Sequence, residues 1–107
     1  MNLKIPTKDI NNRFFQAIEF LIFTKKISGL GPFCEEYGFN RVRYINVRSG
    51  YKPEKGYAYK SLDIEAFYVL AKYFNISLEW LLFGIGNMIK NISKKIKEAE
   101  EDVEIQN

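Results

Sequence analysis

Apolar side chains recur every three or four residues in the first quarter of the chain, the spacing of one face of an α-helix. These positions are Ile10, Phe14, Ala17, Ile18, Leu21 and Ile22. Thr7 or Asp9 can cap the start of such a helix with a side-chain oxygen. The pattern therefore predicts a long first helix over residues 8–25, preceded by an arm at residues 1–7.

Residues 30–49 have the pattern of two short helices joined by a tight turn at Gly38. Glycine adopts the positive φ of such a turn without a steric penalty. We expect helices over residues 32–37 and 41–48. Their apolar or small side chains are expected in the core: Phe33, Cys34, Tyr37, Phe39, Tyr44 and Val47. The other face of the second helix carries Arg41, Val42, Arg43 and Asn46, and Ile45 fits neither face. This is a helix-turn-helix pattern.

Two further helices are predicted after residue 60. The first follows Ser61, a candidate cap, and has an apolar stripe at Leu62, Ala66, Phe67, Leu70, Ala71 and Phe74. The second follows Ser77, a second candidate cap, and ends at Phe83 before two glycines. Trp80 lies between core and surface by spacing, and we expect it to be a packing residue.

Positive charge is concentrated in the body of the chain. The 16 basic and 13 acidic residues give a net charge of +3. Five of the acids lie in residues 98–107, so residues 1–97 carry 16 − 8 = +8. Residues 51–60 interleave Tyr and Lys, whose hydroxyl and ammonium groups commonly bind phosphate oxygens. Lys55 and Tyr57 are therefore candidate phosphate-binding residues. In the alternative, Tyr57 and Tyr59 pack beneath this loop.

Another apolar pattern lies in the tail, residues 87–107. Ile89, Ile92, Ile96, Ala99 and Val103 alternate in steps of three and four, as the seam of a coiled coil does. Ile89, Ile92, Ile96 and Ala99 are therefore candidate dimerisation residues. A helix here would be basic at its start and acidic at its end, which opposes the helix dipole. Antiparallel pairing of two tails would relieve this conflict. In the alternative, the stripe folds back on its own domain.

Several function classes lack sequence support. There is one Cys and no His, so neither an internal disulfide nor a zinc or haem site built on these ligands is possible. No Gly-rich phosphate loop and no catalytic carboxylate pair appears, and we expect neither enzymatic activity nor a cofactor. No apolar run approaches the roughly 18 residues of a membrane span. The N-terminus lacks the apolar block of a signal peptide, so a cytoplasmic protein is expected.

The region 8–86 resembles the lambda-repressor-like helix-turn-helix domain, the Cro/repressor type of bacterial and phage regulators. Phe33, Cys34, Gly38, Phe39, Tyr44, Val47 and Gly50 follow the family's spacing, and ISLEWLLFGIG at residues 76–86 looks like its fifth helix. The resemblance implies an all-α fold, a compact five-helix lambda-repressor-like bundle, with a C-terminal helical tail. Arg48 departs from the family, which often has Glu there, and residues 51–60 form a longer loop than is common.

The same resemblance implies which residues contact DNA. The base-reading positions fall on Arg41, Val42, Arg43 and Asn46, whose chemistry suits guanine, thymine-methyl and adenine edges. Phosphate contacts fall on Tyr51, Lys52 and the backbone near Leu30 and Gly31.

We therefore expect a sequence-specific regulator that binds double-stranded DNA, with no visible small-molecule effector. A homodimer would place two reading helices about 34 Å apart. The alternative is a protein-interaction module on the same fold, an antitoxin-like or adaptor protein, favoured by Ile45, Trp80 and the tail stripe.

Overall fold

The computed structural model describes residues 4–50 and 61–90, which form five helices and no strand. The helices are α1 (Thr7–Phe23), α2 (Leu30–Tyr37), α3 (Arg41–Arg48), α4 (Ile64–Tyr73) and α5 (Leu78–Phe83). The expectation of an all-α fold is confirmed for this part of the chain. None of these helices is both long and apolar enough to cross a membrane.

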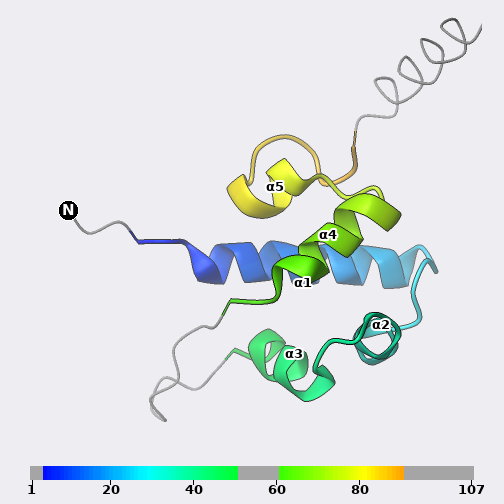
Figure 1. Ribbon diagram of the computed structural model, residues 1–107. Coiled ribbons are helices and arrows are strands. Elements are labelled where there is room, and N and C mark those ends of the chain that lie inside the picture. The colour runs from blue at the N-terminus through cyan, green and yellow to red at the C-terminus, as the bar shows by residue number, and fades with distance from the viewer. Residues whose placement is uncertain (1–3, 51–60, 91–107) are drawn as a thin grey trace, which may run out of the picture.

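The longest helix, α1, runs through the middle of the molecule (Figure 1). The α2–α3 pair lies on one side of it and α5 on the other. α1 packs against both α3 and α5, and α4 packs against α5. A single helix thus supports the helix-turn-helix pair on one flank and α5 on the other.

Aromatic rings fill the centre of the core. Phe14 of α1 is fully buried, and its ring lies 5.2 Å from that of Phe15 and 5.3 Å from that of Phe67 on α4. On its other side it meets the rings of Phe33 and Tyr44 at 6.3 and 6.0 Å. Ring pairs at these separations are attractive beyond the area that they bury. Phe14 therefore joins α1, α2, α3 and α4.

Two predicted helices agree closely with the structure. α3 spans Arg41–Arg48 as predicted, and α5 begins after Ser77, whose hydroxyl accepts a 3.2 Å hydrogen bond from the Trp80 amide. α1 ends at Phe23, two residues earlier than predicted, because Lys25 adopts a left-handed conformation with φ 63°.

The other two helices differ at their starts. α2 begins two residues early, at Leu30. α4 begins at Ile64 with Asp63 in the N-cap position, so Ser61 does not cap it. Leu62, assigned to the α4 stripe, is buried but precedes the helix.

The predicted core is confirmed at Phe33, Cys34, Tyr44 and Val47, each at most 3% exposed. Two further residues assigned to the core, Tyr37 and Phe39, are only half-buried at its edge. Ile22, placed on the apolar face of the first helix, is 36% exposed. Ile45 and Trp80 are half-buried and pack against the core, so the packing role expected for Trp80 is confirmed.

Residues 88–90 are joined to the domain by backbone contacts. Ile89 pairs with Ile76 in an isolated antiparallel bridge, and the Ser77 amide donates to the Met88 carbonyl at 2.7 Å. The Lys90 amide donates in turn to the Asn75 carbonyl at 3.1 Å. The first residues assigned to the tail therefore belong to the folded body.

Candidate nucleic-acid interface

The turn between α2 and α3 is built from three consecutive residues. Gly38 has φ 79°, a conformation that an L-residue with a side chain adopts only at a cost. Phe39 then folds inward and stacks on Tyr44, with ring centroids 5.5 Å apart. The Asn40 side chain accepts a 3.0 Å hydrogen bond from the Arg43 amide and so caps α3. These contacts fix where α3 begins and in which direction it runs.

The inner face of α3 is fixed by Tyr44 and Val47, which are 0% and 3% exposed. The Tyr44 ring lies in the aromatic core, and its hydroxyl donates a 2.6 Å hydrogen bond to Oδ2 of Asp63. The Asp63 amide donates back to the same hydroxyl at 3.3 Å. α3 is therefore attached to the first residue before α4 by a polar contact at the edge of the core.

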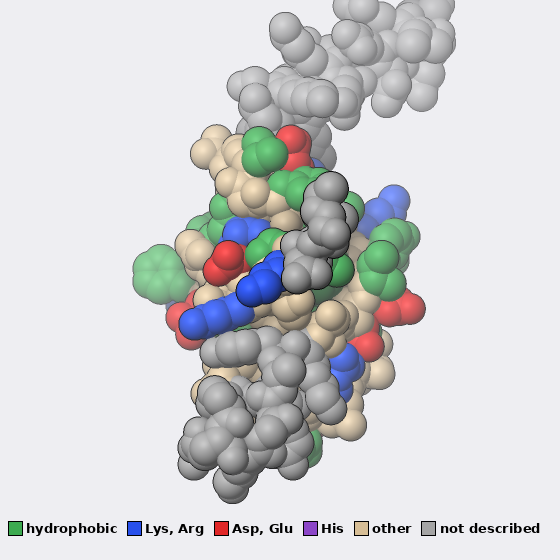
Figure 2. Space-filling view, turned by 90° about the vertical axis from the view of Figure 1, so that its left-hand side faces the viewer, with side chains coloured by type: hydrophobic (Ala, Val, Ile, Leu, Met, Phe, Trp, Pro, Cys, Tyr) green, Lys and Arg blue, Asp and Glu red, His purple; other side chains and the backbone are tan. Residues whose placement is uncertain are grey.

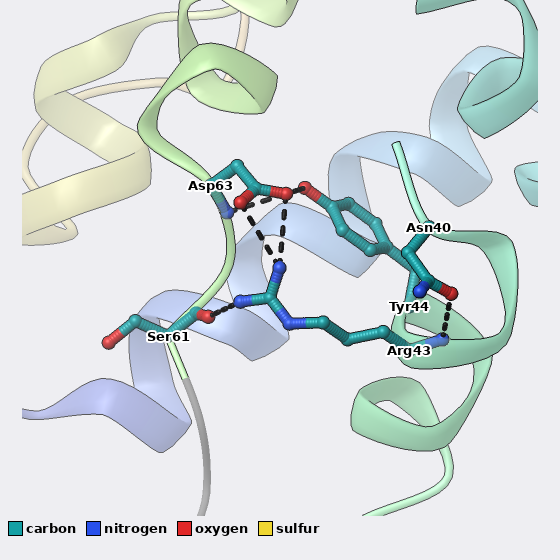
Figure 3. Close-up of polar contacts among 5 residues, drawn as sticks. All are labelled: Asn40, Arg43, Tyr44, Ser61 and Asp63. Atoms are coloured by element: carbon teal, nitrogen blue, oxygen red, sulfur yellow. Dashed lines mark hydrogen bonds and ion pairs between the residues drawn. The ribbon is translucent and has the colours of Figure 1, made fainter. Parts of the chain in front are cut away.

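Arg43 strengthens this attachment (Figure 3). Its Nη1 lies 3.1 Å from both carboxylate oxygens of Asp63, and its Nη2 donates to the carbonyl of Ser61. Its guanidinium carbon lies 5.9 Å from the centre of the Tyr44 ring. The side chain of Arg43, a predicted base-reading residue, thus points toward the start of α4.

The ionisation of this cluster follows from its contacts. The hydrogen bond from Tyr44 and the nearby Arg43 guanidinium lower the pKa of Asp63 below its usual value, against a smaller opposing effect of burial. Burial and the hydrogen bond to Asp63 raise the pKa of Tyr44 well above 10. Asp63 is therefore a carboxylate and Tyr44 a neutral donor at neutral pH.

Arg41 lies at the junction of α2 and α3. Its Nη1 donates to Oε1 of Glu35 at 3.1 Å in an ion pair exposed to solvent on both sides. Its side chain also passes directly over Gly31, where an added Cβ would lie 2.9 Å from Nε. Gly31 therefore permits a close approach between the guanidinium and the first turn of α2, where backbone amides lack helical partners.

The remaining predicted base-reading residues lie on the outer face of α3. Val42 is 67% exposed, and Asn46 is exposed, as is Arg48 at the end of the helix. α3 therefore presents an outer surface of Arg41, Val42, Asn46 and Arg48, while Arg43 is held at its side. Of the backbone positions predicted to bind phosphate, Leu30 is buried and Gly31 is half-buried.

Some predicted site residues lie outside the described residues. These are Tyr51, Lys52, Lys55 and Tyr57 of the loop, and Ile92, Ile96 and Ala99 of the tail. The fourth candidate for dimerisation, Ile89, is half-buried and packs against its own core. Gly50 and Ser61 border residues 51–60 in the sequence, and Arg43 binds the carbonyl of Ser61.

Sequence reasoning missed two polar residues that organise the structure. Asp63 joins α3 to α4 through its contacts with Arg43 and Tyr44. Arg13 donates to the carbonyls of Leu81 and Leu82 at 2.9 and 3.0 Å and satisfies the C-terminal end of α5. Both contacts join residues far apart in sequence, so no local pattern marks them.

Two other kinds of site, a reactive thiol and a metal centre, were considered for residues 4–50 and 61–90. Cys34 is fully buried, and burial raises the pKa of its thiol, which disfavours the reactive thiolate. No group of three or more Cys, Asp or Glu side chains within residues 4–50 and 61–90 could hold a metal ion.

Comparison of the chain with models of known protein families, with curated proteins and with solved structures found no match.

Proposed function

We propose that this chain is a lambda-repressor-like regulator that binds double-stranded DNA, with α3 in the major groove. One observation carries the proposal. α3 is fixed from its inner side by the core and by Asp63, and its outer side presents polar, basic and apolar groups to solvent. A helix that is held rigidly and exposed along its length can place side chains against base edges.

The exposed residues of α3 have the chemistry for base recognition. The Asn46 amide can bind the N6 and N7 atoms of adenine bidentately, and Val42 can pack on a thymine methyl group. A good bidentate pair is worth roughly 1–3 kcal/mol of discrimination between bases. Arg43 takes a positioning role in this proposal, because its contacts with Asp63 and Ser61 hold α3 against α4.

Arg41 suits a phosphate as well as a base. Its guanidinium lies over Gly31 in the first turn of α2. Pro32 has no amide hydrogen and the Phe33 amide donates to the Gly29 carbonyl, so an anion here would use the amides of Leu30 and Gly31 and the positive end of the helix dipole. A phosphate placed here would replace Glu35 as the partner of Arg41.

The proposal includes a homodimer on a pseudo-palindromic site. α3 has only eight residues, so one copy reads few base pairs. Two copies one helical turn apart, about 34 Å, would double the number of base contacts.

The test is selection from random duplexes followed by affinity measurements for Arg41→Ala, Asn46→Ala and Lys72→Ala. Lys72 lies in the last turn of α4, and its variant removes an equal charge at a distance from α3. We expect Asn46→Ala to relax specificity at one base position and Arg41→Ala to lower affinity at least tenfold, with little effect of Lys72→Ala. Equal losses for Arg41→Ala and Lys72→Ala, with no effect of Asn46→Ala, would leave only nonspecific attraction between opposite charges, and the proposal would fail.

The alternative is a protein-interaction module, and the structure weakens part of its basis. Ile45 and Trp80, which favoured it in the sequence, pack against the core. The tail stripe remains as its support, together with single exposed apolar side chains at Phe23, Phe83 and Ile85, which are 85%, 69% and 57% exposed. Stoichiometric capture of one protein partner, without duplex binding at physiological salt, would favour this alternative.

A further inference from the structure

An open groove of about 590 Å³ lies between α1, α4 and α5. It is bounded by the start of α1, the outer face of α4 and the start of α5. Most of its lining is apolar and includes Ile5, Ile10, Ile64, Tyr68, Leu78 and Leu82. Figure 2, seen from the N-terminal end of α1, shows exposed hydrophobic groups lying between charged ones.

Several side chains of this groove are unusually exposed for their type. Ile64 is 78% exposed, Ile5 76%, Tyr68 57% and Leu78 43%. Removing such side chains from water is favourable by about 25 cal/mol for each Å² of apolar surface buried. Large exposed apolar patches on small proteins commonly mark binding surfaces.

We propose that this groove is occupied by residues 92–103 of the same chain, as a helix antiparallel to α4. Lys90 lines the groove, and its ammonium group donates to the carbonyl of Ala71 near the end of α4. The backbone bridge between Ile89 and Ile76 fixes this point of the chain. The apolar stripe of the tail continues three residues after Ile89, at Ile92.

The length of the stripe fits the groove. From Ala71 back to Ile64 the groove follows seven residues of α4, a rise of roughly 10 Å at 1.5 Å per residue. Ile92 and Ala99 are also seven residues apart. An antiparallel helix would therefore place Ile92 by Ala71 and Ala99 by Ile64.

The backbone bridge at Ile89 and the contact of Lys90 with Ala71 set this direction. Lys94 and Lys95 would lie nearer the negative, C-terminal end of α4, where Lys72 also lines the groove. The acids between residues 98 and 104 would lie by the positive ends of α1 and α4, both of which border the groove.

The tether favours the chain's own tail over that of a second copy. A segment joined by a short linker has an effective concentration in the millimolar range, far above that of a protein in dilute solution. The apolar stripe is then buried within one chain, and any second copy on DNA makes contact through another surface. This inference does not depend on DNA binding.

The test is a disulfide between Ile64→Cys and Ala99→Cys in the full chain, formed with oxidised glutathione. Ile64 is exposed, and Cys34 is fully buried and does not compete. The control pairs Ala99→Cys with Glu36→Cys on α2, on the opposite flank of α1. We expect a monomeric disulfide in most molecules of the first variant and few of the control. A covalent dimer, or no excess over the control, would overturn the inference.

A second measurement uses single substitutions in the full chain. Ile96→Asp should expose the groove, lower the melting temperature by about 5 °C and increase the fluorescence of a hydrophobic dye several-fold. Ser93→Asp adds the same charge beside the stripe and should change neither quantity. If the two variants behave alike, the stripe does not fill the groove.

Discussion

The hydroxyl of Tyr44 donates a 2.6 Å hydrogen bond to the carboxylate of Asp63, nineteen residues along the chain. The ring of Tyr44 is fully buried, whereas the side chain of Asp63 is about a third exposed. The contact therefore joins the core side of α3 to the polar start of α4. It explains how a helix of eight residues can be held in place while its outer face stays free.

Removing the charge of Asp63 should loosen α3. Asp63→Asn keeps the shape of the side chain but weakens the hydrogen bonds from Tyr44 and Arg43. We expect the free energy of unfolding in urea to fall by roughly 1–2 kcal/mol, a range reduced for the partial exposure of the site. Glu65→Gln removes the same charge one half-turn further along α4, where the side chain is exposed, and should cost little. A similar loss in both variants would contradict a specific role for Asp63.

The same cluster should give the domain an acid-sensitive stability. The pKa of Asp63 is lower in the folded protein than its ordinary value of 3.8. A carboxyl with a depressed pKa stabilises the fold above its unfolded pKa, and this contribution disappears as the pH falls through the folded pKa. The difference in unfolding free energy between the wild type and Asp63→Asn should therefore be constant from pH 5 to 7 and shrink below about pH 4. Urea titrations at several pH values measure this difference in unfolding free energy. A difference that does not change with pH would refute the ionised Asp63 carboxylate as its cause.

Local patterns were enough to predict most of the fold. The bounds of α3 and the start of α5 follow from cap residues, glycines and helical spacing within a few positions of each other. The burial of Phe33, Cys34, Tyr44 and Val47 follows from the same periodicity. Helix bounds and the buried face of a helix depend on residues that are close together in the sequence, so a local pattern can predict them.

The site was predicted less well because its key contacts are not local. The helical spacing predicts that Arg43 lies on the exposed face of α3, and no local signal in the sequence indicates that its side chain is held by another element. The acceptor, Asp63, lies twenty residues away and comes close to Arg43 only after α4 has packed. Likewise, the approach of Arg41 to Gly31 depends on the angle between α2 and α3. Side-chain partners across a turn or a loop are set by packing, and no spacing rule encodes them.

Glu35 should weaken binding to DNA by competing for Arg41. The pair is exposed on both sides, so it adds little to stability. Glu35→Gln should leave the melting temperature nearly unchanged and raise affinity for duplex DNA about two- to threefold, because repulsion from phosphates falls and Arg41 is released. Glu36→Gln removes an equal charge from the next residue. If both variants raise affinity equally, general electrostatics and not the pair with Arg41 is responsible.

Gly31→Ala should separate stability from binding. The added methyl group would lie 2.9 Å from Nε of Arg41, so the guanidinium must move away from the first turn of α2. Moving a flexible side chain costs little, and alanine favours a helix over glycine by roughly 0.5–1 kcal/mol. We expect an unchanged or higher melting temperature together with about tenfold weaker DNA binding, equivalent to about 1.4 kcal/mol.

A double-mutant cycle shows whether that loss acts through Arg41. If the methyl group weakens binding by displacing the guanidinium, Gly31→Ala should have almost no further effect in the Arg41→Ala background, because the displaced group is already absent. A direct clash between the methyl group and a phosphate would instead give additive losses, since it does not involve Arg41. Additive losses would thus exclude a phosphate site shared by Arg41 and the start of α2, while non-additive losses with an intact melting transition would support it.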